Sequence, residues 1–296
     1  MKSTLFTGSA VALVTPFDNI SGRIDYGKLE ELTEFHIANG TDAIVVCGTT
    51  GEAPTLEDDE HCKAVEVVIG AASGRIPVIA GTGSNNTAHA VMMTEIAEKL
   101  GADGILSVTP YYNKATQNGL YQHYKTIADC TKLPIILYNV PSRTGVNIQP
   151  ATVSRLADID NIVAIKEASG NISQVAQVAA LCGDRIDIYS GNDDQIVPIM
   201  SLGGKGVISV IANVAPQQTH DLVAKYLEGD VKASLDMQLE MIELVGALFC
   251  EVNPIPVKAA MNMMGFDVGG TRLPLCDMAE NNYNTLKTAM KNYGLI

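Results

Sequence analysis

The strongest constraint on the fold is a regular alternation of short apolar runs and helical patterns along most of the chain. Each apolar run has the β-branched character of a buried strand, and a stretch with helical periodicity follows it. The eight runs cover residues 10–14, 43–47, 78–80, 104–107, 135–138, 162–166, 186–189 and 206–210. Eight such units within about 225 residues predict an α/β fold of the closed (β/α)8 TIM-barrel type. An open doubly wound sheet is the alternative, because periodicity alone does not establish closure.

The strand pattern stops after residue 227, and only helical patterns follow. We expect a catalytic barrel over residues 1–227 and a C-terminal helical extension over residues 228–296. The expected helices of the extension cover residues 232–248, 255–264 and 277–291. No segment between the two parts resembles a flexible linker, so the extension should pack on the barrel or join subunits.

Composition excludes several classes of function. A net charge of −13 argues against binding to nucleic acid, whose phosphates require a basic face. No apolar run approaches the roughly 18 residues of a membrane span. The N-terminus lacks the apolar stretch of a signal peptide, which predicts a cytoplasmic location. The six cysteines form no Cys-x-x-Cys motif and are expected to be free, mostly buried thiols.

Metal and nucleotide cofactors are not expected either. The five histidines lie in helical patterns without metal-ligand spacing, which places most of them at the surface or in an interface. A Gly-x-Gly-x-x-Gly motif is missing from the chain. The sequence therefore predicts chemistry carried out by the side chains of the protein alone.

Lys166 ends the sixth apolar run, where a parallel barrel places its functional residues. A buried ammonium is costly, so this lysine either reaches solvent or has a lowered pKa. A neutral amine can form a Schiff base with a carbonyl compound. We expect Ile162 and Ala164 to share the inward face of the strand with Lys166 and to form apolar walls around it.

The loops after the second and fourth runs carry further candidates. Gly48-Thr49-Thr50-Gly51-Glu52 is a tight loop whose backbone N–H groups could face a carboxylate, although an ordinary turn would have the same composition. Tyr111 and Tyr112 follow a proline in the next loop. Their phenols could transfer protons or pack in an interface, and one ring could do each.

The fifth run supplies a third phenol and a guanidinium. Tyr138 ends this run, and Arg143 follows in the loop Val140-Pro141-Ser142-Arg143-Thr144-Gly145. The planar fork of an arginine can hold a carboxylate with two parallel hydrogen bonds, whereas a lone arginine is more often a surface residue. An amine, phenols, hydroxyls and a guanidinium at one end of a barrel together indicate imine chemistry on an acidic substrate.

These motifs also carry a family resemblance. The segments around Thr49, Tyr112, Tyr138 and Lys166, together with Asn253-Pro254-Ile255-Pro256-Val257-Lys258, resemble those of the dihydrodipicolinate synthase family. This family belongs to the N-acetylneuraminate lyase superfamily, and the likeness extends from Gly8 to the C-terminal helices. It implies condensation of pyruvate with L-aspartate 4-semialdehyde to 4-hydroxy-tetrahydrodipicolinate in lysine and diaminopimelate biosynthesis. No cofactor is implied beyond the covalent Schiff base with pyruvate.

The resemblance implies a role for each motif residue. Lys166 would form the Schiff base, and Tyr138 would act as general acid and base in a proton relay with Thr49 and Tyr112. Tyr112 would come from the neighbouring subunit of a homo-oligomer; a dimer of dimers is expected, although a dimer would satisfy this contact equally well.

The remaining implied roles concern substrate binding. Thr50 would bind the pyruvate carboxylate, and Ile208 and Gly191 would line the same site. Arg143 would hold the carboxylate of the second substrate. Members of the superfamily that act on sugar acids typically lack this arginine, so its presence favours the dicarboxylate pathway.

The chain departs from its family in a pocket where lysine inhibits some members. His61, Asn85 and Tyr111 fit the pattern of that pocket, but His89 stands where a glutamate is expected. In addition, Asp58 replaces a histidine, and Ala53-Pro54 replaces a small polar pair. Because a carboxylate for the ammonium of lysine is lost, we expect weak or absent feedback inhibition.

Two alternative functions remain open at this point. A related pyruvate-dependent aldolase would use the same lysine with another aldehyde. A non-catalytic barrel could bind a small acid, but such a protein would be expected to have lost Lys166 or Tyr138, and both are present.

Overall fold

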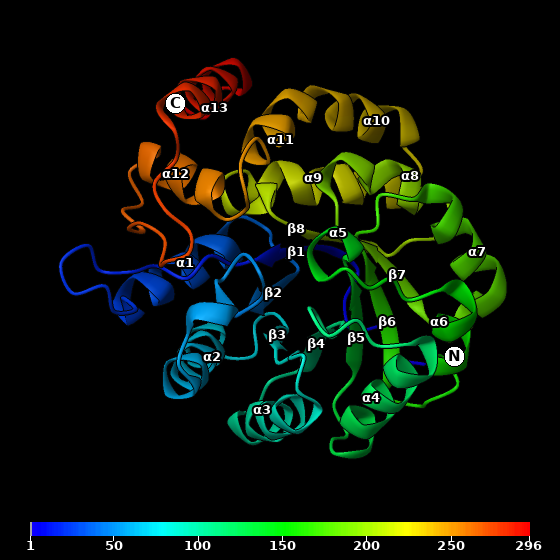
Figure 1. Cartoon of the computed structure of the whole chain (residues 1–296). Helices are drawn as coiled ribbons and strands as arrows, with labels where there is room; N and C mark the ends of the chain where they lie inside the picture. The colour runs from blue at the N-terminus through cyan, green and yellow to red at the C-terminus, as the bar shows by residue number, and fades with distance from the viewer. Residues whose placement is uncertain (1) are drawn as a thin grey trace.

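The computed structural model describes residues 2–296 and contains a closed barrel of eight parallel strands (Figure 1). Each strand pairs with its neighbours in chain order, and β8 pairs with β1 to close the barrel. The strands are β1 Gly8–Ala12, β2 Ala43–Val46, β3 Val78–Gly81, β4 Gly104–Val108, β5 Ile135–Asn139, β6 Ile162–Glu167, β7 Asp187–Ser190 and β8 Gly206–Ser209. The predicted (β/α)8 barrel is confirmed, and the open sheet is wrong.

The barrel is surrounded by helices that connect consecutive strands and by one helix that follows β8. They are α1 Tyr26–Ala38, α2 Asp58–Ala72, α3 Thr87–Leu100, α4 Gln117–Asp129, α5 Pro141–Thr144, α6 Pro150–Leu156, α7 Ile172–Cys182, α8 Ile196–Met200 and α9 Pro216–Leu227. Polar side chains begin several of them; the Asp25 carboxylate, for example, accepts a hydrogen bond from the Lys28 N–H at the start of α1. No helix among residues 2–296 has both the length and the apolar character needed to cross a membrane.

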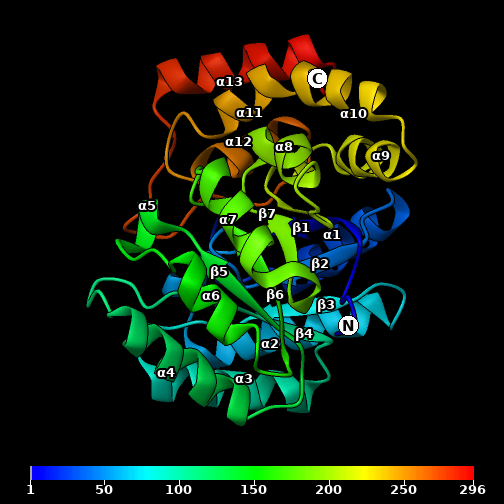
Figure 2. The same ribbon diagram turned by 90° about the vertical axis from the view of Figure 1, so that its right-hand side faces the viewer.

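The extension consists of four helices that gather on one side of the barrel, next to α8 and α9 (Figure 2). They are α10 Val231–Glu240, α11 Ile242–Leu248, α12 Ile255–Met263 and α13 Glu280–Tyr293. The single helix expected over residues 232–248 is wrong, because a turn at Met241 divides it. Neither proline nor glycine marks this turn, so the sequence pattern gives no sign of it.

The first strand lies two residues earlier than expected. The Leu13 N–H still donates to the Val45 carbonyl, at 3.0 Å, but the Val14 N–H donates to the side-chain oxygen of Asn213, at 3.1 Å. A side chain therefore replaces the neighbouring strand at this point, and β1 ends at Ala12 although the apolar run continues.

Two aromatic rings close the amino end of the barrel. Phe6 precedes β1 and stacks on Tyr189 of β7, with the ring centroids 4.2 Å apart. The Tyr189 hydroxyl donates to the Phe6 carbonyl at 2.5 Å. Above them the barrel is filled by small and apolar side chains, among them Ala10, Ile136 and Ile208. The interior is a packed core whose functional space lies at the carboxyl end.

An irregularity in β6 changes the expected face of one residue. The pairing of β5 with β6 shifts after Ile135, which faces Ile162, to Ile136, which faces Ala164. The extra residue, Val163, forms a β-bulge, and Ile162 packs in the outer layer against the helices. The expectation that Ile162 shares the inward face of Lys166 is wrong, whereas Ala164 does lie inside the barrel.

Most of the histidines were expected at the surface or in an interface, but three of the five are buried within the chain: His36, His61 and His123. Two of them meet a threonine hydroxyl at Nδ1, at 3.2 Å for His36 and at 2.9 Å for His123. Such partners allow a neutral imidazole to lie on the inner face of a helix. The cysteines are free, as expected, but only Cys47 and Cys182 are fully buried.

Candidate active site

Lys166 and Tyr138 lie side by side on adjacent strands at the carboxyl end of the barrel. They are paired in the register of β5 and β6, and the Lys166 Nζ lies 4.4 Å from the centroid of the Tyr138 ring. Only 5% of the Lys166 surface is exposed to solvent. The structure therefore holds a primary amine against a phenol in a space that is largely closed to water.

Burial controls the protonation of both groups. Desolvation lowers the pKa of Lys166 from 10.5 to about 8; the Asp193 carboxylate opposes this fall, and the Arg143 guanidinium adds to it. Burial also raises the pKa of the Tyr138 phenol, and Arg143 and a hydrogen bond with Thr49 offset part of the rise. At pH 7 the phenol is protonated, and about one tenth of the Lys166 amine is neutral.

Because Gly191 has no Cβ atom, it makes room for the Lys166 side chain. A Cβ atom at this position would lie 3.1 Å from the Cγ of Lys166 and 2.7 Å from the Cβ of Ala168. The Gly191 N–H donates to the Glu167 carbonyl at 2.8 Å, so the backbone approaches β6 closely. Gly191, predicted as a residue of the site, therefore touches the lysine itself.

Asp193 is a buried carboxylate near Lys166 that the sequence analysis did not single out. Its Oδ2 accepts hydrogen bonds from the N–H groups of Val210, at 3.0 Å, and Ile211, at 2.9 Å. Burial raises its pKa, while these hydrogen bonds and the charge of Lys166 lower it. Two consecutive aspartates follow β7, and sequence alone does not tell that Asp193 is buried and Asp194 exposed.

A second buried carboxylate, Glu167, was also missed. Both of its oxygens lie 3.1 Å from the side-chain nitrogen of Asn139, and Oε1 accepts from the Ser169 N–H at 2.8 Å. Gln174 donates to Oε2 at 3.2 Å. These bonds fasten β5 to β6 and the start of α7 beside Lys166, so they help to fix the strand that carries the amine.

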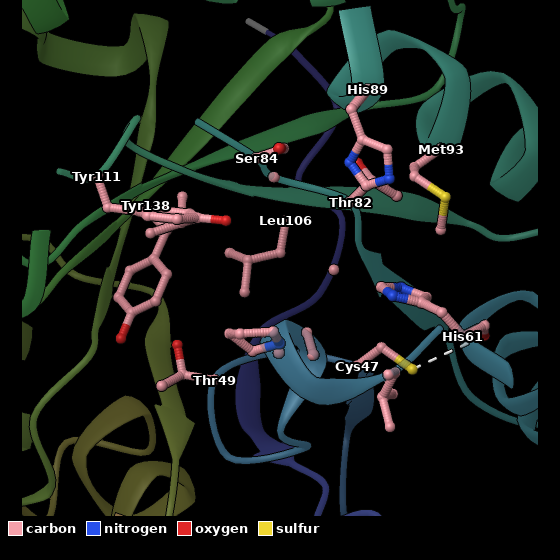
Figure 3. Close-up of a pocket in the computed structure, with 17 residues that line it drawn as sticks. Cys47, Thr49, His61, Thr82, Ser84, His89, Met93, Leu106, Tyr111 and Tyr138 are labelled. Atoms are coloured by element: carbon pink, nitrogen blue, oxygen red, sulfur yellow. Dashed lines mark hydrogen bonds between the residues drawn. The ribbon is translucent and has the colours of Figure 1, made fainter. Parts of the chain in front are cut away.

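The loop Gly48–Glu52 brings two hydroxyls to the same mouth. Thr50 is buried, and its Oγ1 accepts a hydrogen bond from the side-chain amide of Asn253 at 3.0 Å. With one acceptor site of the hydroxyl occupied, its proton is free to point at a ligand. Thr49 lies beside Tyr138 (Figure 3).

Arg143 lies at the rim, on the short helix α5, and its charge acts on both Lys166 and Tyr138. The guanidinium donates to the Asn253 carbonyl at 3.2 Å. Within residues 2–296 this is the one hydrogen bond of the guanidinium, so most of its N–H groups are available to a ligand. The structure therefore brings together Lys166, Tyr138, Thr49, Thr50, Gly191 and Arg143, while Ile208 lies buried in the barrel wall on β8.

Tyr112 does not reach the interior of its own chain. Its backbone has a left-handed φ of 73°, and 89% of its surface is exposed. A non-glycine residue in this conformation is disfavoured by about 1–3 kcal/mol and is typical of functional sites. Its neighbour Tyr111 lines a cavity instead, and its carbonyl accepts a hydrogen bond from the Asn85 side chain at 3.2 Å.

That cavity, of about 190 Å³, separates Tyr138 and Thr49 on one side from His61 and His89 on the other (Figure 3). Three of the four residues expected in an effector pocket line this space, Tyr111, His61 and His89, and the fourth, Asn85, is joined to Tyr111 by its side-chain hydrogen bond. His89 Nε2 lies 2.9 Å from the Asp58 carboxylate. Among the described residues that line the cavity, no side chain carries a carboxylate. Within residues 2–296, no group of three or more potential ligand side chains is placed to hold a metal ion.

Comparison with known proteins gives a consistent family. Residues 5–293 match the model of the dihydrodipicolinate synthetase family. A 4-hydroxy-tetrahydrodipicolinate synthase from Clostridium novyi (strain NT) is 56% identical over 290 residues, or 98% of this chain and 97% of the relative. The chain also resembles two solved structures, each covering 99% of it and matched over 100% of its own length. One is dihydrodipicolinate synthase from Acinetobacter baumannii complexed with pyruvate, with a TM-score of 0.96 and 46% identity. The other is the enzyme from Cyanidioschyzon merolae with lysine bound, with a TM-score of 0.97 and 41% identity.

Proposed function

The chain belongs to the dihydrodipicolinate synthetase family, and we propose how its barrel performs the family's reaction. The enzyme condenses pyruvate with L-aspartate 4-semialdehyde to 4-hydroxy-tetrahydrodipicolinate, a step of lysine and diaminopimelate biosynthesis. One observation carries the mechanism: a buried lysine with a pKa lowered to about 8 faces a phenol at the barrel mouth. This arrangement supplies a nucleophile that is partly neutral at physiological pH.

The first half of the reaction attaches pyruvate to the enzyme. The Lys166 nitrogen attacks C2 of pyruvate, and the resulting carbinolamine loses water to form the Schiff base. Loss of a proton from the methyl carbon then gives an enamine. Tyr138 moves these protons, and its high pKa keeps the phenol protonated when the leaving water requires a donor. Thr49 beside it, and Tyr112 from a second subunit, would relay protons to solvent.

The second half forms the new carbon–carbon bond. The enamine carbon attacks the aldehyde carbon of aspartate semialdehyde, whose oxygen is protonated. The amino group of this substrate then attacks the imine carbon, which closes the ring and releases the Lys166 amine. Each bond made by Lys166 is broken again, so the reaction needs no external cofactor.

Substrate binding follows from the groups that surround the amine. The free proton of the Thr50 hydroxyl is suited to the pyruvate carboxylate, and Gly191 and the backbone of Ile208 complete the walls of that site. Arg143 at the rim would hold the carboxylate of the second substrate. Because the guanidinium lies further out than Lys166, it would meet the substrate that arrives second.

We further propose a homo-oligomer in the cytoplasm, with residues 1–227 as the catalytic barrel and residues 228–296 as its extension. The exposed, left-handed Tyr112 supports the shared site, because a ring held in this way has little use in an isolated subunit. Dimer and dimer of dimers predict different masses in analytical ultracentrifugation, and a monomer that is fully active would contradict the role of Tyr112.

Lysine is expected to inhibit weakly or not at all. The effector-like cavity contains His89 in place of a glutamate, and His89 is already paired with Asp58. An ammonium group would therefore find imidazoles where it needs a carboxylate. A steady-state assay checks this expectation, and inhibition at micromolar lysine would contradict it.

Borohydride reduction in the presence of pyruvate tests the proposed mechanism. A stable mass increase is expected on the peptide that carries Lys166. Its absence would exclude both the proposed synthase and a related pyruvate-dependent aldolase. The variant Arg143→Ala should keep this adduct but lose turnover with aspartate semialdehyde. Arg155→Ala is the matched control, since Arg155 stacks on Tyr121 outside the barrel. A panel of aldehydes would reveal another second substrate if turnover survived in Arg143→Ala.

A further inference from the structure

A buried ion pair joins the extension to the loop that carries the two threonines. Lys258 on α12 lies 2.9 Å from Glu52, the last residue of Gly48–Glu52, and the two side chains are only 2% and 1% exposed. The Lys258 ammonium also donates to the Thr15 carbonyl at 2.9 Å and lies 4.1 Å from the centroid of the Phe17 ring. Its hydrogen-bonding capacity is thus directed at the barrel mouth.

The other oxygen of Glu52 is held by the extension as well. It accepts a hydrogen bond from the Arg272 backbone N–H at 2.9 Å. The backbone of Glu52 is left-handed, with a φ of 55°, which a non-glycine residue adopts only when its surroundings require it. Two contacts from residues 228–296 therefore fix a loop residue in a conformation that it would not choose alone.

The extension contacts the same loop at a second point. Asn253, at the start of the segment that leads into α12, donates to the Thr50 hydroxyl at 3.0 Å, and its carbonyl accepts from Arg143. Asn253 thus touches both residues assigned to substrate carboxylates. A displacement of α12 would be passed to Thr50 through Asn253 and to the end of the loop through Glu52.

We propose that Glu52 and Lys258 are positioning residues that set the affinity for pyruvate by holding the Gly48–Glu52 loop against the barrel mouth. This inference rests on the proposed function, because it assumes that Thr50 binds the pyruvate carboxylate. Stability alone does not require a charged pair here, since well-packed apolar residues can replace a buried ion pair without loss of stability. The ion pair does hold the Gly48–Glu52 loop in one defined position. The loop requires such a position if the Thr50 hydroxyl is to point at the pyruvate carboxylate.

The variants Glu52→Gln and Lys258→Met remove one charge each, and Glu52→Gln/Lys258→Met leaves no unpaired charge. In each variant the KM for pyruvate should rise by roughly 10- to 100-fold, the effect typical of a displaced binding group. The kcat at saturating pyruvate should fall as well, because Thr49 of the proton relay lies on the same loop, whereas the KM for aspartate semialdehyde should change by less than about threefold, because Arg143 is carried by α5. The exposed pair Lys225–Glu228, changed to Met and Gln, is the matched control and should leave all three parameters unaltered.

Two outcomes would overturn the inference. In one, folded variants keep the wild-type KM for pyruvate. In the other, kcat and both KM values fall or rise together in step with the melting temperature, which would indicate a purely structural pair. The proposed function has a separate readout: if the wild type forms no borohydride-stable adduct at Lys166, the function fails, whatever the variants do.

Hydrogen exchange on the wild-type protein tests the same coupling without a variant. The inference can therefore be tested even if the variants do not fold. Addition of pyruvate should slow amide exchange both in residues 48–52 and in residues 253–258. Protection confined to the barrel loop, with no change in the segment of the extension, would show that the two are not coupled and would overturn the inference.

Discussion

Replacing Lys166 with methionine is expected to stabilise the fold while removing the Schiff base. The folded protein holds this amine at a pKa of about 8, compared with 10.5 for a free lysine. Protonation therefore favours the unfolded chain by about 3 kcal/mol at pH 7, since one pKa unit corresponds to about 1.4 kcal/mol. Methionine keeps an unbranched apolar side chain against Tyr138 and has no charge to desolvate.

The pH window of this gain follows from the two pKa values. Below pH 8, Lys166 is protonated in both states, so the full penalty of the buried ammonium applies. Between pH 8 and 10.5 the folded protein has released its proton, and the penalty declines as the unfolded chain loses its own. The advantage of the variant should therefore shrink from about 3 kcal/mol at about pH 7 to roughly 1.4 kcal/mol at about pH 9.5.

Urea denaturation of both proteins at these two pH values, at one fixed protein concentration, measures the difference. Lys232→Met is the matched control, because the Lys232 side chain is 82% exposed and its ammonium is hydrated in both states. A loss of stability in Lys166→Met at pH 7 would refute the reasoning. An equal gain at both pH values would also refute it, since the gain would then come from packing and not from the buried charge.

Three further predictions follow from the same geometry. In Asp193→Asn, the pH midpoint of borohydride trapping should move down, because the Asp193 carboxylate raises the pKa of Lys166; the exposed Asp194→Asn serves as control and should leave the midpoint unchanged. Gly191→Ala should lower kcat by at least about tenfold, because its Cβ would displace Lys166, whereas Gly70→Ala on α2, with open space around it, should keep activity and gain up to about 1 kcal/mol of stability. Acid should destabilise the protein below pH 6.5, because burial lowers the pKa of three histidines to about 3 or 4: His36, His61 and His123. Each unfolded histidine then binds a proton that its folded counterpart does not, which amounts to about 2 kcal/mol each at pH 5; denaturation curves that do not change between pH 7 and pH 5 would contradict this.

The barrel could be predicted from the sequence because its signal is repeated. Each buried strand is a short run of β-branched and apolar residues, and eight of them leave few topologies open. The same rule placed Lys166, Tyr138 and Thr49 at one end, because the carboxyl ends of parallel strands meet there. Departures from the rule came from features with no sequence signal, such as the bulge at Val163 and the turn at Met241.

Residues that act through tertiary contacts could not be predicted in this way. Asp193 differs from Asp194 only in which side of a turn it occupies, and Glu167 is buried among amides contributed by other elements. The pairing of Glu52 with Lys258 joins positions far apart in the chain. Periodicity reports which face of an element is apolar, whereas these pairings depend on how distant segments are placed relative to one another.

Because the stacked rings of Phe6 and Tyr189 close the amino end of the barrel, the active site opens to solvent at the carboxyl end. Both substrates must enter, and the product must leave, through the opening that Arg143 borders. The molecule that is consumed first must therefore occupy the innermost place, and any molecule bound nearer the exit blocks it. An excess of the aldehyde added ahead of pyruvate should accordingly delay the onset of turnover, because aldehyde bound at the opening keeps pyruvate from reaching Lys166.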